Sequence, residues 1–225
     1  MIGIIVAEEK ELIEVQNVMT DIKEKQVYEK VFYLGKIEEK EVVLGRANIG
    51  KVNSARLAQI LIDKFNVELV INVGSAGSVD NRLNIGDVVV ATKLVQHDFD
   101  ITPFGRKLGE IDNVGQYIEV KKELLDLIND RKVFKGIIAS GDKFVHILEE
   151  KEKIRDTFNA LCVEMEGASI AQVCFLDNIP FLIIRSITDK LDGTSKVEYD
   201  KFLSSSSKEA ARILKEFIKE YKKAR

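Results

Sequence analysis

The sequence predicts a three-layer α/β/α domain with a central sheet of parallel or mixed strands, and three observations lead to that class. Short apolar runs typical of buried strands alternate with segments of helical spacing along the whole chain. A chain of 225 residues can bury one sizeable core, so a single domain over residues 1–225 is expected. Only two prolines occur, and no low-complexity linker separates a second domain.

The first half of the chain alternates short strands with helices. The expected strands are apolar or alternating runs, the middle two joined by a charged turn as in a hairpin, at residues 2–7, 31–34, 41–46 and 69–73. Two segments carry apolar side chains three or four positions apart, as one face of a helix does, over residues 8 to about 22 and 53–65.

The second half continues the same alternation. Apolar runs predict strands at 88–91, at 133–139, up to about Val163, and at 181–185. Helices are expected over residues 121–130, 148–158 and 165–176, and an amphipathic helix is expected from about Phe202 to the end of the chain. The one serine run, residues 204–207, lies inside that last helical pattern, and no internal repeat is visible.

Composition and charge limit the kinds of partner that the protein is expected to bind and the compartment in which it is expected to reside. The 34 Lys and Arg residues against 37 Asp and Glu residues give a net charge of -3, which argues against a nucleic-acid or membrane partner. No apolar run reaches the roughly 18 residues of a spanning helix, and the acidic start of the chain does not resemble a signal peptide. Cys162 and Cys174 lie in apolar surroundings, which favours buried free thiols and a cytoplasmic protein.

Searches for common catalytic motifs exclude several classes. Residues 45–52 (GRANIGKV) nearly match a phosphate-binding P-loop, but Val52 replaces the Ser or Thr that would hold magnesium. No dinucleotide fingerprint, serine nucleophile elbow or Cys/His zinc spacing is present. His97, Asp98 and Asp100 could suggest a metal site, but a loop with ordinary hydrogen-bonding side chains is favoured. We therefore expect neither a metal nor a cofactor.

Acidic residues follow three of the expected strands. Glu8, Glu9 and Glu11 follow the first, Glu164 and Glu166 follow the strand near Val163, and Asp189 follows the apolar run 181–184 across residues 185–188. Ligands of α/β proteins bind at the carboxyl ends of strands, so these clusters are expected to converge on one crevice. Each cluster alone could be a solvated helix start or a cap; together they indicate acid/base chemistry.

Eight segments carry a resemblance to a known family. The chain resembles the bacterial 5′-methylthioadenosine/S-adenosylhomocysteine nucleosidases, within the nucleoside phosphorylase superfamily. The matching segments follow the family order and span most of the chain: IGIIVAEEKEL (2–12), NIGKVNSA (48–55), VINVGSAGSV (70–79), NIGDVVVA (84–91), HDFDITPFG (97–105), IIASGDKFV (137–145), VEMEGASIAQVC (163–174) and IPFLIIRSITD (179–189). The resemblance implies a nucleoside phosphorylase-like fold and hydrolysis of the N-glycosidic bond in a small-molecule nucleoside.

The resemblance also implies roles for three carboxylates. Asp189 matches the general acid that protonates N7 of adenine, and Thr188 matches the hydroxyl residue that orients it. Glu11 matches the general base that activates the attacking water. Glu166 matches the carboxylate that hydrogen-bonds the ribose hydroxyls. Acid and base catalysis by two carboxylates flanking a glycosidic bond needs no metal.

Further pocket residues follow from the same resemblance. Met165 and Ile49 are expected to pack around the sugar and line the pocket, Phe144 to stack on adenine, and the backbone of Val145 to read the edge of the base. The remaining match is a glycine-rich loop near ribose and base, formed by Ser75, Ala76 and Gly77. Phe104 matches an aromatic residue lent by the neighbouring subunit to the 5′-alkylthio group, which implies a homodimer.

Some positions depart from the family pattern. Thr188 stands where Ser is usual and keeps the hydroxyl, whereas Glu8 replaces an apolar residue and Val6 a glycine. These changes, with Pro103 and the polar stretch 111–113, leave open the ranking of methylthioadenosine, S-adenosylhomocysteine, 5′-deoxyadenosine and aminodeoxyfutalosine.

Two other functions stand as alternatives. One is a phosphate-dependent purine nucleoside phosphorylase, which would need an arginine in the stretch 73–77 (VGSAG), where none occurs. The other is a nucleoside-binding protein without catalysis, which would not need both Glu11 and Asp189.

Overall fold

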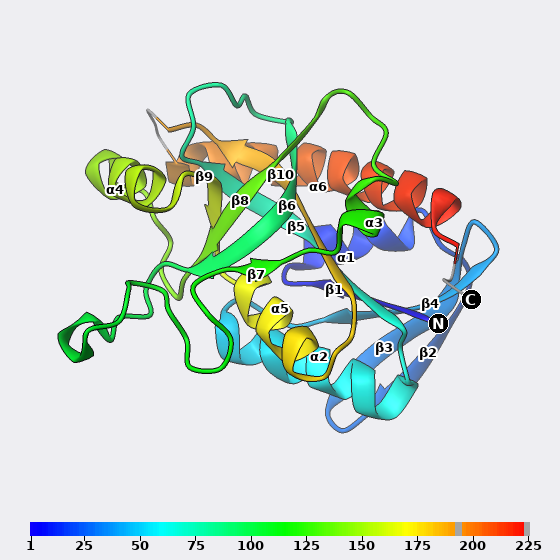
Figure 1. Cartoon of the computed structure of the whole chain (residues 1–225). Coiled ribbons are helices and arrows are strands. Elements are labelled where there is room, and N and C mark those ends of the chain that lie inside the picture. Colours follow the sequence, from blue (N-terminus) through cyan, green and yellow to red (C-terminus); the bar gives the residue numbers. More distant parts are fainter. Residues whose placement is uncertain (192–194, 223–225) are drawn as a thin grey trace.

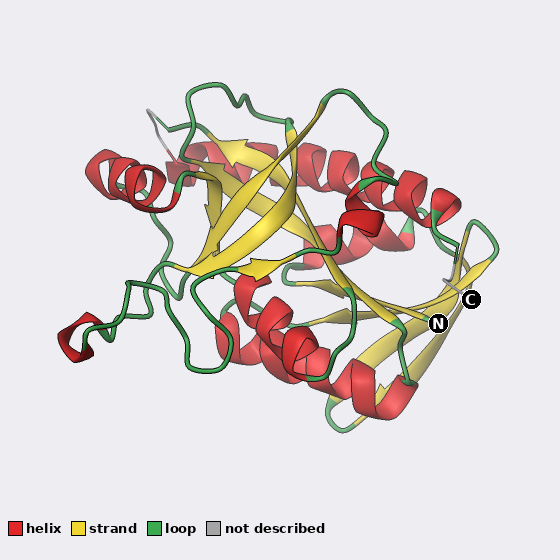
Figure 2. Ribbon diagram, viewed as in Figure 1, coloured by secondary structure: helices red, strands yellow, loops and turns green. Residues whose placement is uncertain are grey.

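A mixed β-sheet runs through the computed structural model, which describes residues 1–191 and 195–222, apart from the side chains of residues 195 and 196. Helices α2 (Lys51–Phe65) and α5 (Gly167–Leu176) pack together on one side of the sheet, and α1 (Glu9–Gln16) and α6 (Ser195–Glu220) pack together on the other (Figures 1 and 2). The expected α/β class with a central mixed sheet is confirmed.

Ten strands and two further short helices complete the described elements. The helices are α3 (Lys122–Leu125) and α4 (Leu148–Phe158), with a 3-10 turn η1 (Thr102–Phe104). The strands are β1 (Ile2–Val6), β2 (Thr20–Val27), β3 (Lys30–Ile37), β4 (Lys40–Arg46), β5 (Leu69–Ser78), β6 (Val88–Gln96), β7 (Ile118–Glu119), β8 (Val133–Ser140), β9 (Ala160–Glu164) and β10 (Phe181–Asp189).

Strand pairing closes part of the sheet into a ring. The strands follow the order β10-β6-β8-β9-β5-β1-β4-β3-β2, and β10 also pairs with β5. Because β1, β5 and β10 run parallel, their carboxyl ends meet at one edge. β9 runs antiparallel to β5, but the two overlap only at their carboxyl ends, where Gly77 lies opposite Val163. The ends of all four strands therefore gather at one place.

The core is built from strands whose side chains are buried on both faces. Every residue of β1, β9 and β10 is buried, as expected when helices cover both sides of a parallel sheet. The cysteines Cys162 and Cys174 are free and fully buried, as the sequence predicts. None of the helices in the described ranges is long and apolar enough to cross a membrane.

The expected helix over residues 8 to about 22 is wrong in its second half. Helix α1 ends at Gln16, and β2 begins at Thr20. Met19 is buried like Leu12 and Val15, so the apolar spacing continues past the end of the helix. β2 has no apolar alternation of its own, because it is an exposed edge strand whose partner is β3.

Two other helix boundaries differ from expectation. Of the expected helix at 121–130, only Lys122–Leu125 is helical, and the chain continues in turns in which Ile128 N donates to the Leu125 carbonyl at 3.2 Å. The ammonium of Lys135 also binds the carbonyl oxygens of Leu125 (2.7 Å) and Ile128 (3.0 Å). Helix α6 starts at Ser195, seven positions before the expected Phe202. The hairpin β3–β4 and helix α4 are confirmed.

Candidate active site

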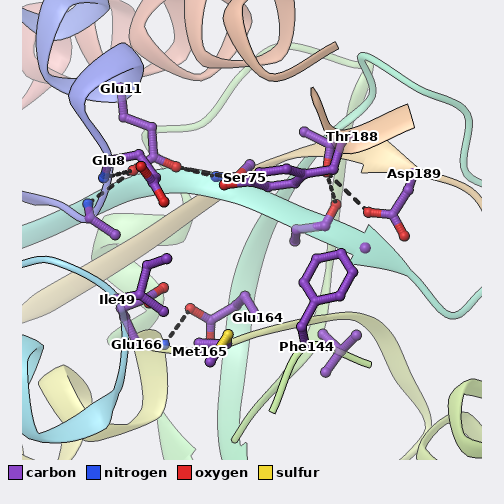
Figure 3. A pocket seen from close by; sticks show the side chains of 15 residues that line it. Glu8, Glu11, Ile49, Ser75, Phe144, Glu164, Met165, Glu166, Thr188 and Asp189 are labelled. Atoms are coloured by element: carbon purple, nitrogen blue, oxygen red, sulfur yellow. Dashed lines mark hydrogen bonds between the residues drawn. The ribbon is translucent and has the colours of Figure 1, made fainter. Parts of the chain in front are cut away.

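A cavity of about 300 Å³ lies where β1, β5, β9 and β10 end, a size that suits a small organic ligand (Figure 3). Carboxylates from three different segments line it, so the convergence expected from the sequence is confirmed for Glu8, Glu11, Glu164, Glu166 and Asp189. Glu9 instead points outward and pairs with Arg46 at 2.6 Å. Ten residues proposed from the resemblance line the cavity: Glu11, Ile49, Ser75, Ala76, Gly77, Phe144, Met165, Glu166, Thr188 and Asp189.

Glu11 is buried in the first turn of α1 and accepts four hydrogen bonds. Its Oε2 accepts from the backbone N–H groups of Ala7 (2.9 Å) and Glu8 (3.0 Å), which caps the start of the helix. Its Oε1 accepts from the backbone N–H (3.0 Å) and hydroxyl (3.2 Å) of Ser75 in β5. The carboxylate is thus fixed between two neighbouring strands and faces the cavity (Figure 3).

A buried arginine holds the two carboxylates that follow β9. Arg185 in β10 is 1% exposed and donates to Glu164 Oε2, while its Nη2 lies 3.5 Å from Glu166 Oε2. Glu164 also accepts from the backbone N–H groups of Glu166 (3.0 Å) and Gly167 (2.8 Å) at the start of α5. Glu166 Oε1 accepts from Gly50 N at 3.0 Å. No sequence pattern marks Arg185 as a site residue, because it lies inside an apolar strand.

The two carboxylates differ in protonation. Burial alone would raise the pKa of Glu164, but the charge of Arg185 and hydrogen bonds from Ser140 and Arg185 hold it below its ordinary value. Burial, together with the charge of Glu164, raises the pKa of Glu166 to about 8. Glu164 is therefore the ionised partner of Arg185, and Glu166 is the one of the two carboxylates that binds a proton more readily.

Asp189 is the last residue of β10 and is 1% exposed. Its Oδ1 lies 3.1 Å from the hydroxyl of Thr188, so the orienting contact expected of Thr188 is present. Its Oδ2 accepts from the ammonium of Lys151 at 2.8 Å. Gly77 lies opposite Asp189 in β5, and a Cβ at Gly77 would come within 2.9 Å of Oδ2, so the carboxylate needs a glycine there.

Ser75, Ala76 and Gly77 belong to strand β5 and do not form the glycine-rich loop expected from the resemblance. The strand extends to Ser78 because β10 pairs with it along this stretch, with Ser75 opposite Ser186. The apolar run that predicts the strand ends at Val73, which hid this extension. The same pairing makes Asp189 part of a strand.

Five cavity residues lie outside the set proposed from the resemblance: Ala7, Glu8, Val163, Glu164 and Tyr199. Tyr199, near the start of α6, packs edge-on against Phe144 with ring centroids 5.8 Å apart. Burial and the nearby Glu11 and Glu8 raise the pKa of Tyr199, so its phenol stays neutral. Glu8 is half-buried in the wall, and burial and Glu11 raise its pKa. A lone tyrosine at a helix start has no sequence pattern that marks it, whereas Glu8 stood out as a departure from the family.

Val145 and Phe104 lie outside the main cavity. Val145 is buried and lines a smaller adjoining cavity together with Phe144, Gly77 and Asp189. Phe104 ends the turn η1 and is 85% exposed, so it does not pack into the core of its own chain. Phe104 therefore does not line the cavity of its own chain.

Comparison with known proteins gives the family. A sequence profile described as "Phosphorylase superfamily" matches residues 1–219. The 5′-methylthioadenosine/S-adenosylhomocysteine nucleosidase of Staphylococcus haemolyticus is 38% identical over 226 residues, which cover 97% of this chain and 99% of the relative. The chain belongs to this nucleosidase family.

Solved structures of family members agree with that assignment. The nucleosidase of Streptococcus pneumoniae in complex with 8-aminoadenine has a TM-score of 0.94 and 37% identity, covering 98% of this chain and 99% of that chain. A Helicobacter pylori structure described as a futalosine hydrolase has a TM-score of 0.93 and 36% identity, covering 98% and 97%.

The charges around this nucleosidase cavity bear on phosphate and metal binding. No Lys or Arg is among the described residues that line it, and the ammonium of Lys51, in the near-P-loop segment, is bound by Asp98 at 2.7 Å. Within the described ranges, no group of three or more His, Cys, Asp or Glu side chains could hold a metal ion. The sequence predicts that His97 is an ordinary hydrogen-bonding loop residue. In the structure its Nε2 is instead buried and has no hydrogen-bond partner.

Proposed function

We propose that the protein hydrolyses the N-glycosidic bond of 5′-methylthioadenosine and S-adenosylhomocysteine, releasing adenine and the 5-thio-substituted ribose. One observation carries the proposal: in a chain of this family, Glu11 and Asp189 face the same nucleoside-sized cavity from neighbouring segments of its wall. The names of the relatives supply the two substrates.

In the proposed reaction, Asp189 gives a proton to N7 of adenine while the C1′–N9 bond breaks and its electron pair passes to the base. A water molecule attacks C1′ and gives a proton to Glu11. Adenine leaves as its neutral N7–H tautomer, Asp189 regains a proton from solvent, and Glu11 releases one, so each turnover consumes one water. A positioned acid and a positioned base each contribute about 10²–10⁴-fold to such a rate.

The other lining residues bind and orient the nucleoside. Protonated Glu166 can donate to one ribose hydroxyl and accept from the other. We assign Met165 and Ile49 to the sugar, Phe144 to the face of adenine and the Val145 backbone to its edge. The β5 residues Ser75, Ala76 and Gly77 form the wall beside ribose and base, and Thr188 orients Asp189.

The assembly and compartment belong to the same proposal. Phe104 is exposed on a turn, and we assign it to the 5′-alkylthio group of a substrate bound in the partner subunit of a homodimer. The two free, buried thiols suit the reducing conditions of the cytoplasm.

Product analysis tests the reaction type. In phosphate-free buffer, the purified protein should release adenine and free 5-methylthioribose from methylthioadenosine, because no cationic side chain of the described cavity wall is placed to bind phosphate. Chromatography with mass spectrometry reads both products. A ribose 1-phosphate product, or an absolute need for phosphate, would replace the hydrolase with a phosphorylase.

A further inference from the structure

Helix α4 places a lysine where its spacing calls for an apolar side chain. The buried residues of α4 are Lys151, Ile154 and Phe158, which share one face of the helix. Ile154 and Phe158 belong to an apolar cluster with Val79, Val95, Ala139, Val145, Ala160 and Val163. The Lys151 side chain itself is 0% exposed.

The ammonium of Lys151 reaches the carboxylate assigned as the general acid. Its Nζ lies 2.8 Å from Asp189 Oδ2 and 2.6 Å from the carbonyl oxygen of Lys190. A buried ammonium is costly to desolvate unless it is paired, and replacing a whole buried ion pair by apolar residues is often neutral or stabilising. An apolar pair would stabilise the fold at least as well, so the presence of both Lys151 and Asp189 calls for a functional reason.

We propose that Lys151 is a positioning residue for Asp189: it holds Oδ2 and stabilises the carboxylate that remains once Asp189 has protonated the base. This inference rests on the proposed function. The proton moves from Asp189 to N7 of adenine, and the bond's electron pair moves to the base, so negative charge is left on Asp189 beside the ammonium. Lys151 gives up no proton and touches no reacting atom.

No other cation takes this position among the described residues around Asp189. Strand β9 contributes Cys162 and Glu164, and α6 contributes Glu198, whose carboxylate accepts from Lys190 N at 3.0 Å. Gly77 of β5 has no side chain, and Thr188 offers a neutral hydroxyl. Lys143 lines the small adjoining cavity with Asp189, but its ammonium is bound by Glu150 at 2.5 Å. Of the described residues, only Lys151 therefore places an ammonium in hydrogen-bond contact with Asp189.

The test compares kcat–pH profiles of Lys151→Met, Lys151→Gln and Lys151→Arg with the native protein, using methylthioadenosine. Met and Gln should lower kcat about 10- to 100-fold, the equivalent of losing one charge-assisted hydrogen bond. They should also shift the kcat–pH profile, because the ammonium contacts the group that gives up the proton in the proposed reaction. Arg, which keeps the charge, should restore most of the native profile.

Controls separate this role from a structural one. Lys153→Met makes the same chemical change on the exposed side of the same helix and should leave kcat and the profile unchanged. In an Asp189→Asn background, Lys151→Met should cause no further loss, since the two residues act as a unit. This double variant replaces the buried ion pair by neutral groups, so it also reports the role of Lys151 if Lys151→Met alone does not fold.

Two 5′-methylthio inhibitors give a readout that needs no turnover. A 9-deaza analogue carries N–H at position 7 and donates to the Asp189 carboxylate, whereas a 7-deaza analogue carries C–H there. Lys151→Met should weaken the first about tenfold at neutral pH and leave the second unchanged. An unshifted profile in Lys151→Met and Lys151→Gln would overturn the role of Lys151, whereas full activity of Asp189→Asn would overturn the general acid itself.

Discussion

The three carboxylates assigned to the cavity differ in how their oxygens are held. Glu11 accepts four hydrogen bonds from neutral donors, Glu166 accepts one from Gly50 and lies near Arg185, and Asp189 lies between a hydroxyl and an ammonium. Glu11 is thus an acceptor held in a fixed place, as a base for water should be, whereas Glu166, whose pKa burial raises, is suited to offer a proton to a sugar hydroxyl.

Glu11→Gln tests that difference. The amide oxygen can keep two of the four contacts, but an amide cannot take a proton from water, so kcat should fall at least about 10²-fold. Affinity for a non-hydrolysable methylthioadenosine analogue should stay within a few-fold. Calorimetry and initial rates measure the two quantities. Glu166→Gln is the comparison, since it should weaken binding as well as rate; identical behaviour of the two variants would contradict the separate roles.

The raised pKa of Glu166 predicts a pH dependence of stability. The unfolded chain releases this proton near the ordinary value of 4.5, and the folded protein keeps it to about 8. The folded state therefore binds more protons across this window, and its stability falls as pH rises from about 5 to 8. Urea unfolding should show a decline that is smaller in Glu166→Gln by more than about 1 kcal/mol.

Comparing the native protein with Glu166→Gln removes the contribution of other groups whose pKa values differ between the folded and unfolded states. His97, whose pKa burial lowers, and Glu8, whose pKa burial raises, are present in both proteins. Parallel stability curves for the native protein and Glu166→Gln would mean that Glu166 is ionised in the folded state.

At the scale of elements, a glycine in strand β5 leaves room for two side chains, one from β10 and one from α1. A Cβ at Gly74 would lie 2.3 Å from Arg185 Nη1 and 3.0 Å from Glu11 Oε1. Arg185 cannot retreat, since its Nη2 binds Asn72 and Glu164. Gly74 thus lets the arginine and the proposed base share one stretch of strand.

Gly74→Ala should therefore cost stability and activity together. We expect a loss of about 1–3 kcal/mol in the free energy of unfolding, the range for overpacking a core, and a marked fall in kcat as Glu11 moves. Denaturant titration and initial rates provide the two measurements. Gly86→Ala is the matched control: a Cβ there meets nothing within 4 Å, so its φ of +89° should cost stability without touching turnover.

The sequence predicts those elements whose own residues determine them. The hairpin β3–β4, helix α4 and the strands β1 and β8 follow from local pattern and are found within two or three residues of the expected bounds. Strand β2 and the outer parts of β5 and β10 exist because another strand pairs with them, which no local pattern records. For the same reason the convergence of carboxylates could be expected from strand ends, but the contacts of Arg185 and Lys151 could not.

At the scale of the whole molecule, the exposed Phe104 predicts assembly. Under the homodimer proposal, Phe104→Ala should leave the fold intact and weaken binding of substrates with large apolar 5′-groups by about 1–3 kcal/mol. Adenosine, which lacks such a group, should lose much less and serves as the control. Sedimentation of the native protein is the simpler check, because a fully active monomer would exclude any contribution of Phe104 to a partner's cavity.

The pairing of β5 with β10 also sets the spacing between the two residues proposed for catalysis. Ser75, which holds Glu11, lies opposite Ser186, and Gly77 lies opposite Asp189. Two residues of β5 span about 7 Å. Strand pairing therefore sets the distance between Ser75, which holds the proposed base, and the proposed acid. The register shifts between Ile187 and Asp189, where β10 has one residue more than β5, so removing that extra residue would change the direction of the Asp189 side chain. Changes in the loops can therefore alter which substrate binds, while the strands keep the distance between the proposed acid and base unchanged.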